Sequence, residues 1–171
     1  YALEAFRFMV SFATSLGMVE LKIFVGNGNI ISLILQDEIL HRDWTAYLIN
    51  QNCKDDNRFA EIKKECEEEV YKLYMDVIRE EKEWAKYLFQ KGPVIGLNEN
   101  ILCDFMDWIA FSALKEIGIK YSTNIKTNPI PWFQKHIDPS RKQTALQENE
   151  SVNYVLGVMD TSITHGDLPD V

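Results

Sequence analysis

The first 25 residues constrain the fold most strongly, because their apolar side chains recur at helical spacing on nearly every face of the expected helix. Leu3, Phe6, Met9 and Val10 illustrate the pattern. A helix that is apolar nearly all round is buried among other elements. Glu4 lies inside this segment, and a buried carboxylate is costly unless a cation or a proton accompanies it. The segment therefore predicts a buried helix in which the carboxylate of Glu4 has a partner.

Three further segments have helical spacing, and turn-forming residues separate them. We expect helices at residues 1–25, 30–50, 55–89 and 99–117, with a break at 26–29. The two prolines of residues 128–132 (NPIPW) argue against a helix there. No segment has a convincing strand pattern. The predicted fold class is all-α, with a helical domain at residues 1–138 and a flexible polar tail at 139–171.

Composition excludes some classes of partner. The formal net charge is -8, whereas phosphate binding needs clustered Lys and Arg, so we expect no nucleic acid and no acidic membrane surface as partner. No apolar run reaches the ~18 to 20 residues of a membrane span. The three cysteines lack metal-type spacing and fit a reducing compartment, so we expect a cytoplasmic protein.

The motif with the clearest chemistry is Glu-x-x-His, formed by Glu38 and His41. Residues three apart share one helix face, so this carboxylate and this imidazole can meet one metal ion. The motif alone is weak evidence, but Glu4 lies in the preceding apolar helix. Di-iron carboxylate bundles use one Glu from each of two helices and Glu-x-x-His from each of two others. The chain shows half of that pattern, in the expected order.

The spacing of these donors adds a geometric expectation. Glu4 lies roughly 31 Å from the end of a straight helix at residue 25, whereas Glu38 lies only about 12 Å into the next helix. An antiparallel return would leave the two carboxylates apart. We therefore predict a kink or a π-type bulge between Phe12 and Met18, near Gly17.

Several collinear motifs carry a family resemblance. They are residues 3–12 (LEAFRFMVSF), 26–31 (GNGNII), 37–41 (DEILH), 83–89 (EWAKYLF), 95–98 (IGLN) and 128–132 (NPIPW). Together they closely resemble the small, radical-generating subunit of class I ribonucleotide reductase, most of all the enterobacterial and phage type. The resemblance implies the C-terminal portion of a ferritin-like di-iron carboxylate bundle. Because position 1 is Tyr and no capping residue precedes it, we expect the upstream helices of a longer protein to be absent.

The resemblance implies a ligand set for the metal. Glu4, Glu38 and His41 match three of the six ligands of a dimetal centre, which holds two Fe ions per full subunit, with Mn as the alternative. The other ligands and the radical-bearing tyrosine belong to the upstream part.

The resemblance also implies residues that surround and relay the radical. Phe8, Phe12 and Ile34 match the apolar pocket around the tyrosyl radical. Asp37, Glu148 and Tyr154 match the path along which the radical moves to the large subunit.

The implied function is reduction of ribonucleoside diphosphates to deoxyribonucleotides, performed in complex with a large catalytic subunit on which the tail docks. The full small subunit is expected to be a homodimer in the cytoplasm, or in the host cytoplasm if a phage encodes it. This chain alone should be inactive. Two alternatives stay open, namely another ferritin-like di-iron oxidase and a non-catalytic helical interaction module.

Overall fold

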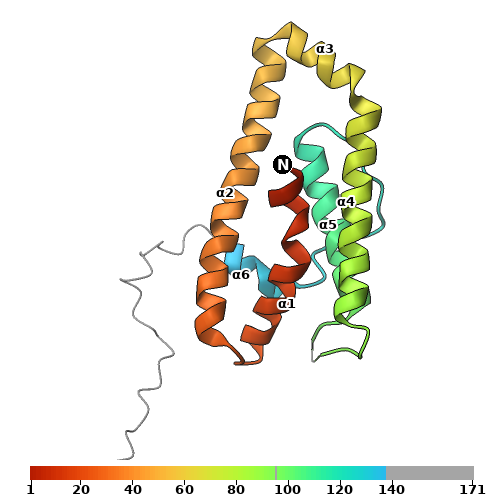
Figure 1. The fold of residues 1–171 in the computed structure, drawn as a ribbon. Coiled ribbons are helices and arrows are strands. Elements are labelled where there is room, and N and C mark those ends of the chain that lie inside the picture. The colour runs from red at the N-terminus through yellow and green to blue at the C-terminus, as the bar shows by residue number, and fades with distance from the viewer. Residues whose placement is uncertain (95, 138–171) are drawn as a thin grey trace, which may run out of the picture.

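The computed structural model describes residues 1–94 and 96–137, and every regular element in that part is helical (Figure 1). In chain order the elements are η1 (Leu3–Arg7), α1 (Met9–Glu20), α2 (Val25–Asp55), α3 (Asn57–Glu65), α4 (Glu67–Leu88), α5 (Glu99–Glu116), η2 (Pro131–Phe133) and α6 (Gln134–Ile137). The all-α prediction is confirmed. Within the described residues, no helix combines the length and hydropathy needed to cross a membrane.

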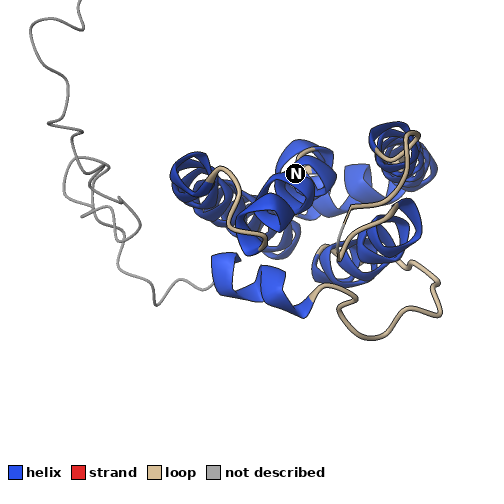
Figure 2. Cartoon of the chain, turned by 90° about the horizontal axis from the view of Figure 1, so that it is seen from below, coloured by secondary structure: helices blue, strands red, loops and turns tan. Residues whose placement is uncertain are grey.

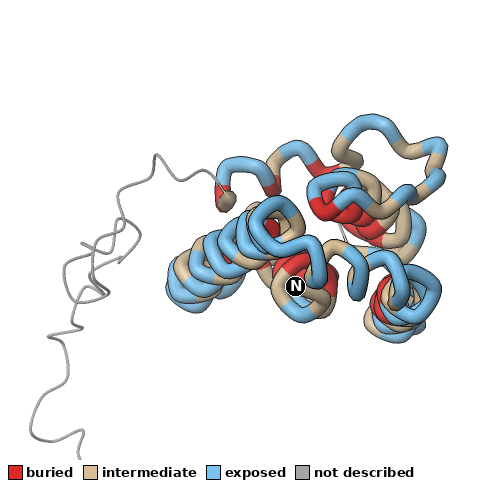
Figure 3. Tube along the Cα trace, turned by 90° about the horizontal axis from the view of Figure 1, so that it is seen from above, coloured by how far each residue is buried: buried red, intermediate tan, exposed pale blue. Residues whose placement is uncertain are grey.

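The first two elements lie at the centre of the molecule. In Figures 1 and 2, η1 and α1 run between α2 on one side and the pair α4–α5 on the other. Phe6, Val10 and Leu16 have no exposed surface, and they pack with α5 residues such as Phe105 in one core. Figure 3 shows buried residues gathered along this N-terminal segment. The prediction that the first helix is buried is therefore confirmed.

The expected kink between Phe12 and Met18 is absent. α1 continues through Gly17 to Glu20, and the irregular turn lies earlier, in the π-helical element η1 that contains Glu4. Gly17 does not interrupt the helix. It allows close packing instead, because a Cβ built there would lie 2.4 Å from Leu97 Cδ1. The location predicted for the distortion was wrong, although a π-type distortion of this segment exists.

The predicted break at residues 26–29 was also wrong. The chain turns at residues 21–24, where Lys22 and Phe24 have positive φ, and α2 begins at Val25. Gly28 lies within α2 and faces α1. A Cβ built at this position would lie 2.1 Å from Val19 Cγ2. Glycine at this position permits a close approach of the two helices, which is a packing role that local sequence patterns do not reveal.

Two glycine substitutions separate packing from helix propensity. We expect Gly28→Ala to destabilise the full-length subunit by about 1–3 kcal/mol, because Val19 must move to accommodate the new methyl group. Gly26→Ala is the matched control: beyond its own helix backbone, no atom of the described residues lies within 4 Å of its built Cβ, so the better helix former should stabilise by up to about 1 kcal/mol. Urea unfolding measures both, and equal effects of the two substitutions would contradict the close packing of α1 and α2.

The later helices follow the prediction more closely. Asp56 caps α3, accepting a hydrogen bond from the Arg58 N–H at 2.8 Å. The long helix predicted at 55–89 is divided at Cys66 into α3 and α4. α5 ends one residue before the predicted end, and Gly118 has the left-handed φ of 80° that suits glycine after a helix.

Residues 128–132 need a small correction. Pro131 opens a short 3₁₀ turn, Pro131–Phe133, although we expected no helical structure there. Proline is tolerated at the first helical position because the N–H it lacks would have no partner within the helix.

Candidate metal centre

Glu4 is presented by the π-helical turn at the centre of the molecule. Its side chain is 23% exposed, and its Oε2 atom is buried. The Tyr1 amino group lies 2.9 Å from this atom and forms an ion pair with it. That contact lowers the pKa of Glu4, while burial opposes the effect.

Glu38 and His41 share one face of α2, as the motif predicts. His41 Nδ1 lies 3.6 Å from Glu38 Oε2, and the His41 side chain is 61% exposed. η1 packs against α2, and His41 contributes to the lowered pKa of Glu4. The carboxylate of Glu4 and the imidazole of His41 therefore lie within electrostatic range of each other.

The donor chemistry fits a dimetal centre in part. Carboxylate and imidazole ligands suit Fe and Mn, and Glu4 offers a buried carboxylate oxygen. Yet within residues 1–94 and 96–137, no three His, Cys, Asp or Glu side chains are gathered closely enough to hold an ion. The residues present fit the group in kind, and further donors are needed to complete it.

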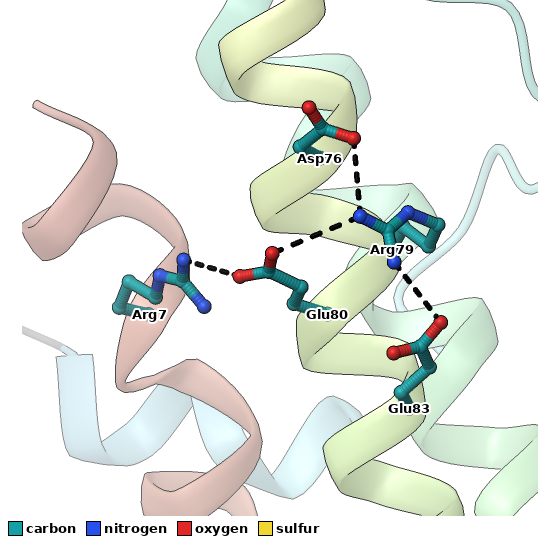
Figure 4. A network of polar contacts seen from close by, with 5 residues as sticks. All are labelled: Arg7, Asp76, Arg79, Glu80 and Glu83. Atoms are coloured by element: carbon teal, nitrogen blue, oxygen red, sulfur yellow. Dashed lines mark hydrogen bonds and ion pairs between the residues drawn. The ribbon is translucent and has the colours of Figure 1, made fainter.

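A network of ion pairs connects the π-helical turn to α4 (Figure 4). Arg7, the last residue of η1, lies 2.5 Å from Glu80 of α4. Glu80 in turn lies 3.7 Å from Arg79, which also pairs with Asp76 at 3.1 Å and with Glu83 at 3.2 Å. These contacts join the segment that carries Glu4 to a second helix of the core.

Comparison with known proteins decides the family. The family model described as "Ribonucleotide reductase, small chain" matches residues 1–129. The chain belongs to this small-chain family.

Individual relatives agree with the family model. The chain is 40% identical over 169 residues to the ribonucleoside-diphosphate reductase 1 subunit beta of Salmonella typhimurium, which covers 98% of this chain and 45% of the relative. It is 36% identical over 168 residues to the subunit beta of Enterobacteria phage T4, with 95% and 43% covered. The chain thus spans less than half the length of these curated relatives.

A solved structure supports the fold. The ribonucleotide reductase R2 subunit from Clostridium botulinum matches with a TM-score of 0.72 at 20% identity, covering 80% of this chain and 43% of that one. The likeness confirms that the helices have the arrangement found in small subunits of this family.

The other predicted residues are placed as follows. Phe12 is buried, whereas Phe8 and Ile34 are 41% and 45% exposed. The rings of Phe8 and Phe12 meet edge to face with centroids 6.1 Å apart. Asp37 is exposed. Glu148 and Tyr154 lie outside the described residues, so the roles of the pocket and path residues stay predictions.

The sequence analysis did not identify Glu81 as a buried acid of this chain. Its side chain is only 5% exposed, its Oε2 makes no hydrogen bond among the described residues, and burial raises the pKa of this carboxyl to about 7. The run EEKE at residues 80–83 resembles a solvated surface. A signal was present, because Glu81 continues the helical spacing of the buried positions Tyr74, Val77 and Ile78, ahead of Ala85.

Glu81 makes stability depend on pH. Its pKa is about 7 in the folded state and near the ordinary 4.5 when unfolded, so folding takes up a proton between these values. The contribution of Glu81 to stability is therefore greatest below pH 4.5 and is lost as the pH rises to 7, by about 3 kcal/mol in total. We expect Glu81→Gln to remove this loss, so that urea unfolding at pH 8 shows a more stable variant than wild type.

The control for this prediction is Glu83→Gln, which alters an exposed carboxylate on the same helix. Its stability should follow the wild-type pH dependence. Parallel pH profiles for Glu81→Gln and the wild type would contradict the assignment of a neutral, buried carboxyl to Glu81.

His136 is a second residue that the sequence did not single out. It is buried, its Nδ1 lies 2.8 Å from Ser32 Oγ of α2, and its Nε2 lies 3.4 Å from Glu20 Oε1 of α1. Lys135 also pairs with Glu20, at 2.5 Å. These contacts fasten α6 across α1 and α2, and they depend on residues more than 100 positions apart in the chain.

Proposed function

We propose that this chain is part of the small subunit of a class I ribonucleotide reductase and supplies Glu4, Glu38 and His41 to its dimetal centre. In complex with the large catalytic subunit, the full protein would support reduction of ribonucleoside diphosphates to deoxyribonucleotides. The observation that carries the proposal is the family match over residues 1–129, which includes all three donors. Two Fe ions per full subunit are the proposed metal, with Mn as the alternative.

The three donors would act through charge and position. Glu4 offers a buried carboxylate oxygen, Oε2. Glu38 and His41 offer a carboxylate and an imidazole from successive turns of α2. Asp37, beside Glu38, is proposed to hold a metal-ligating imidazole of the remaining part of the subunit, because such a carboxylate orients the ring and raises its basicity.

The apolar residues would keep water away. A dimetal centre supplies the oxidising chemistry that forms a stable tyrosyl radical in the full subunit. Phe8, Phe12 and Ile34 are proposed to line the pocket around that tyrosine. Phe12 is already buried, and Phe8 contacts it edge to face. The exposed surfaces of Phe8 and Ile34 are available for contact with the rest of the protein.

The part of the full subunit that this chain does not include would supply the remaining metal ligands. The chain spans 45% of the Salmonella relative. α2 exposes a row of large apolar side chains, including Leu40 at 63%, Trp44 at 59% and Tyr47 at 54%. An exposed apolar face of this kind is typical of a surface that other helices cover. We propose that the other helices of the bundle cover it and that the full subunit forms a homodimer in the cytoplasm.

The segment after the helical domain is proposed to reach the large subunit. Division of the chain into a domain at residues 1–138 and a docking tail at 139–171 remains part of the proposal. Within the tail, Tyr154 is proposed to relay the radical, and Glu148 is proposed to support the transfer.

Deleting residues 145–171 from the full-length subunit tests the proposal. A reductase subunit loses turnover with its large subunit and keeps its metal, since the ligands lie elsewhere. Another ferritin-like di-iron oxidase would keep its activity after the deletion, and that result would contradict the proposal. The third possibility, a helical interaction module, would bind no metal before or after the deletion.

A further inference from the structure

Arg7 is the last residue of the π-helical turn that carries Glu4. η1 spans Leu3–Arg7, and Glu4 lies three residues before Arg7 within it. A π turn has hydrogen bonds between residues i and i+5, so it contains one more residue than an α turn. If η1 relaxed into α-helical geometry, the side chain of Glu4 would rotate about the helix axis relative to Arg7. The direction of the Glu4 carboxylate therefore depends on the contacts that keep this turn in place.

The contacts that hold η1 differ in how strictly they define its orientation. Phe6 is buried and meets the ring of Tyr74 edge to face, with centroids 5.7 Å apart. Apolar burial of this kind is largely non-directional. Arg7 instead donates a charge-assisted hydrogen bond to Oε2 of Glu80 in α4, at 2.5 Å, and such bonds have a defined geometry. The Arg7–Glu80 contact thus fixes the end of η1 on α4 more specifically than apolar packing does.

Glu80 is itself restrained on the surface of α4. Its Oε2 faces Arg7, and its Oε1 lies 3.7 Å from Arg79. Arg79 in turn donates hydrogen bonds to Asp76 at 3.1 Å and to Glu83 at 3.2 Å. Figure 4 shows the Glu80 carboxylate between the two guanidinium groups. α4 therefore offers Arg7 an acceptor whose own position is held by a network of neighbours.

We propose that Arg7 and Glu80 form a positioning pair for Glu4, which anchors the end of η1 on α4 and so keeps the Glu4 carboxylate directed toward the metal site. The inference rests on the proposed function, in which Glu4 is a metal ligand. The two side chains of the pair are 35% and 42% exposed, and ion pairs with this exposure contribute little to global stability. Loss of the pair should therefore leave the fold intact while it loosens η1.

Three variants of the full-length subunit test whether the two side chains act as a pair. Arg7→Gln and Glu80→Gln each remove one charge, and the double variant removes both. Glu83→Gln is the matched control, because Glu83 belongs to the same network but, in the described part of the chain, pairs with Arg79 and not with Arg7. The charge of Arg7 also opposes the effect of burial on the pKa of Glu81, so Glu80→Gln is the more selective of the two single substitutions.

The first readout is amide hydrogen exchange of residues 3–8 in the metal-free protein. A partly exposed ion pair changes an equilibrium by a factor of about three to five, so we expect exchange to become faster by about that factor in both single variants and in the double variant. Glu83→Gln should exchange at the wild-type rate. Wild-type exchange in both single variants, or equal acceleration in the control, would overturn the anchoring of η1. If Arg7→Gln does not fold, Glu80→Gln and its control decide.

The second readout is titration with Co²⁺, followed by its visible absorption spectrum. We expect the affinity to fall about three- to five-fold in Arg7→Gln, in Glu80→Gln and in the double variant alike, because side chains that act as one pair have non-additive effects. The spectrum should change in the same three variants, whereas Glu83→Gln should match the wild type. A loss in the double variant equal to the product of the two single losses would show that the side chains act independently, and it would overturn the pair. Wild-type affinity and spectrum in variants whose η1 exchanges faster would overturn the positioning of Glu4.

The two proposals fail in different ways. Absence of Co²⁺ binding by the wild-type subunit would contradict the proposed function and, with it, the role of the pair toward a ligand. Normal Co²⁺ binding by the wild type and by both single variants would contradict the positioning role alone.

Discussion

Replacing Glu38 with alanine is expected to abolish stable metal binding by the full-length subunit and to lower ribonucleotide reduction at least about 100-fold. In the proposed site the carboxylate would provide one of the charges that balance the metal ions, and its loss leaves His41 without its neighbour at 3.6 Å. Removal of a group that merely orients a ligand already costs about 10–100-fold in affinity or activity. Removal of a ligand itself should cost more. Elemental analysis of the purified subunit and a reductase assay with the large subunit measure the two effects.

Glu61→Ala provides the control for Glu38→Ala. Glu61 is an exposed carboxylate on α3 that pairs only with Arg58 among the described residues, at 3.3 Å. Metal content and turnover should remain at wild-type levels in this variant. A Glu38→Ala subunit that retains its full metal content would show that Glu38 is not a ligand.

Replacing Phe6 with alanine should destabilise the fold by about 3–5 kcal/mol, the usual cost of deleting a buried aromatic side chain. Phe6 has no exposed surface and lies in the π-helical turn that carries Glu4. Its ring meets those of Tyr1 and Tyr74 edge to face, with centroids 6.3 Å and 5.7 Å away. A cavity at this place would remove contacts of η1 with both α4 and α5.

Urea unfolding of the full-length subunit measures the loss. Tyr87→Ala is a suitable control, because Tyr87 is 59% exposed on α4 and, in the described part of the chain, its ring stacks only on Trp84. Its substitution should cost less than about 1 kcal/mol. Equal losses for Phe6→Ala and Tyr87→Ala would contradict the placement of η1 at the centre of the core.

Helix type and helix ends were predictable where the signals are local. The spacing of apolar residues identifies α4 and α5, and the caps at Asp56 and Asn98 follow from their side chains, which accept hydrogen bonds from nearby backbone N–H groups. Gly26 and Gly28 misled the prediction, because glycine marks a turn by default. At Gly28 its small size instead lets α2 approach Val19.

Features that depend on distant residues were not predictable in the same way. The π-helical turn at Glu4 is held by contacts with α4, such as Arg7 with Glu80. Those partners lie more than 70 residues further along the chain. Glu81 is buried in the folded chain, although it lies within the charged run of residues 80–83.

The candidate site also combines features that local sequence predicts with features that depend on distant residues. Placement of Glu38 and His41 on one face follows from helical periodicity alone and is observed at 3.6 Å. The approach of Glu4 to that face depends on where the first helix is distorted, and the position predicted for the distortion was wrong. Assignment of the three residues as ligands rests on the family resemblance and remains a proposal.

The most direct test of the central claim is the metal content of the wild-type full-length subunit, combined with anomalous diffraction from its crystals. We predict about two Fe or Mn ions per subunit, with anomalous peaks beside the carboxylates of Glu4 and Glu38 and the imidazole of His41. A normally folded subunit that binds no metal, or binds it away from these three residues, would contradict the account.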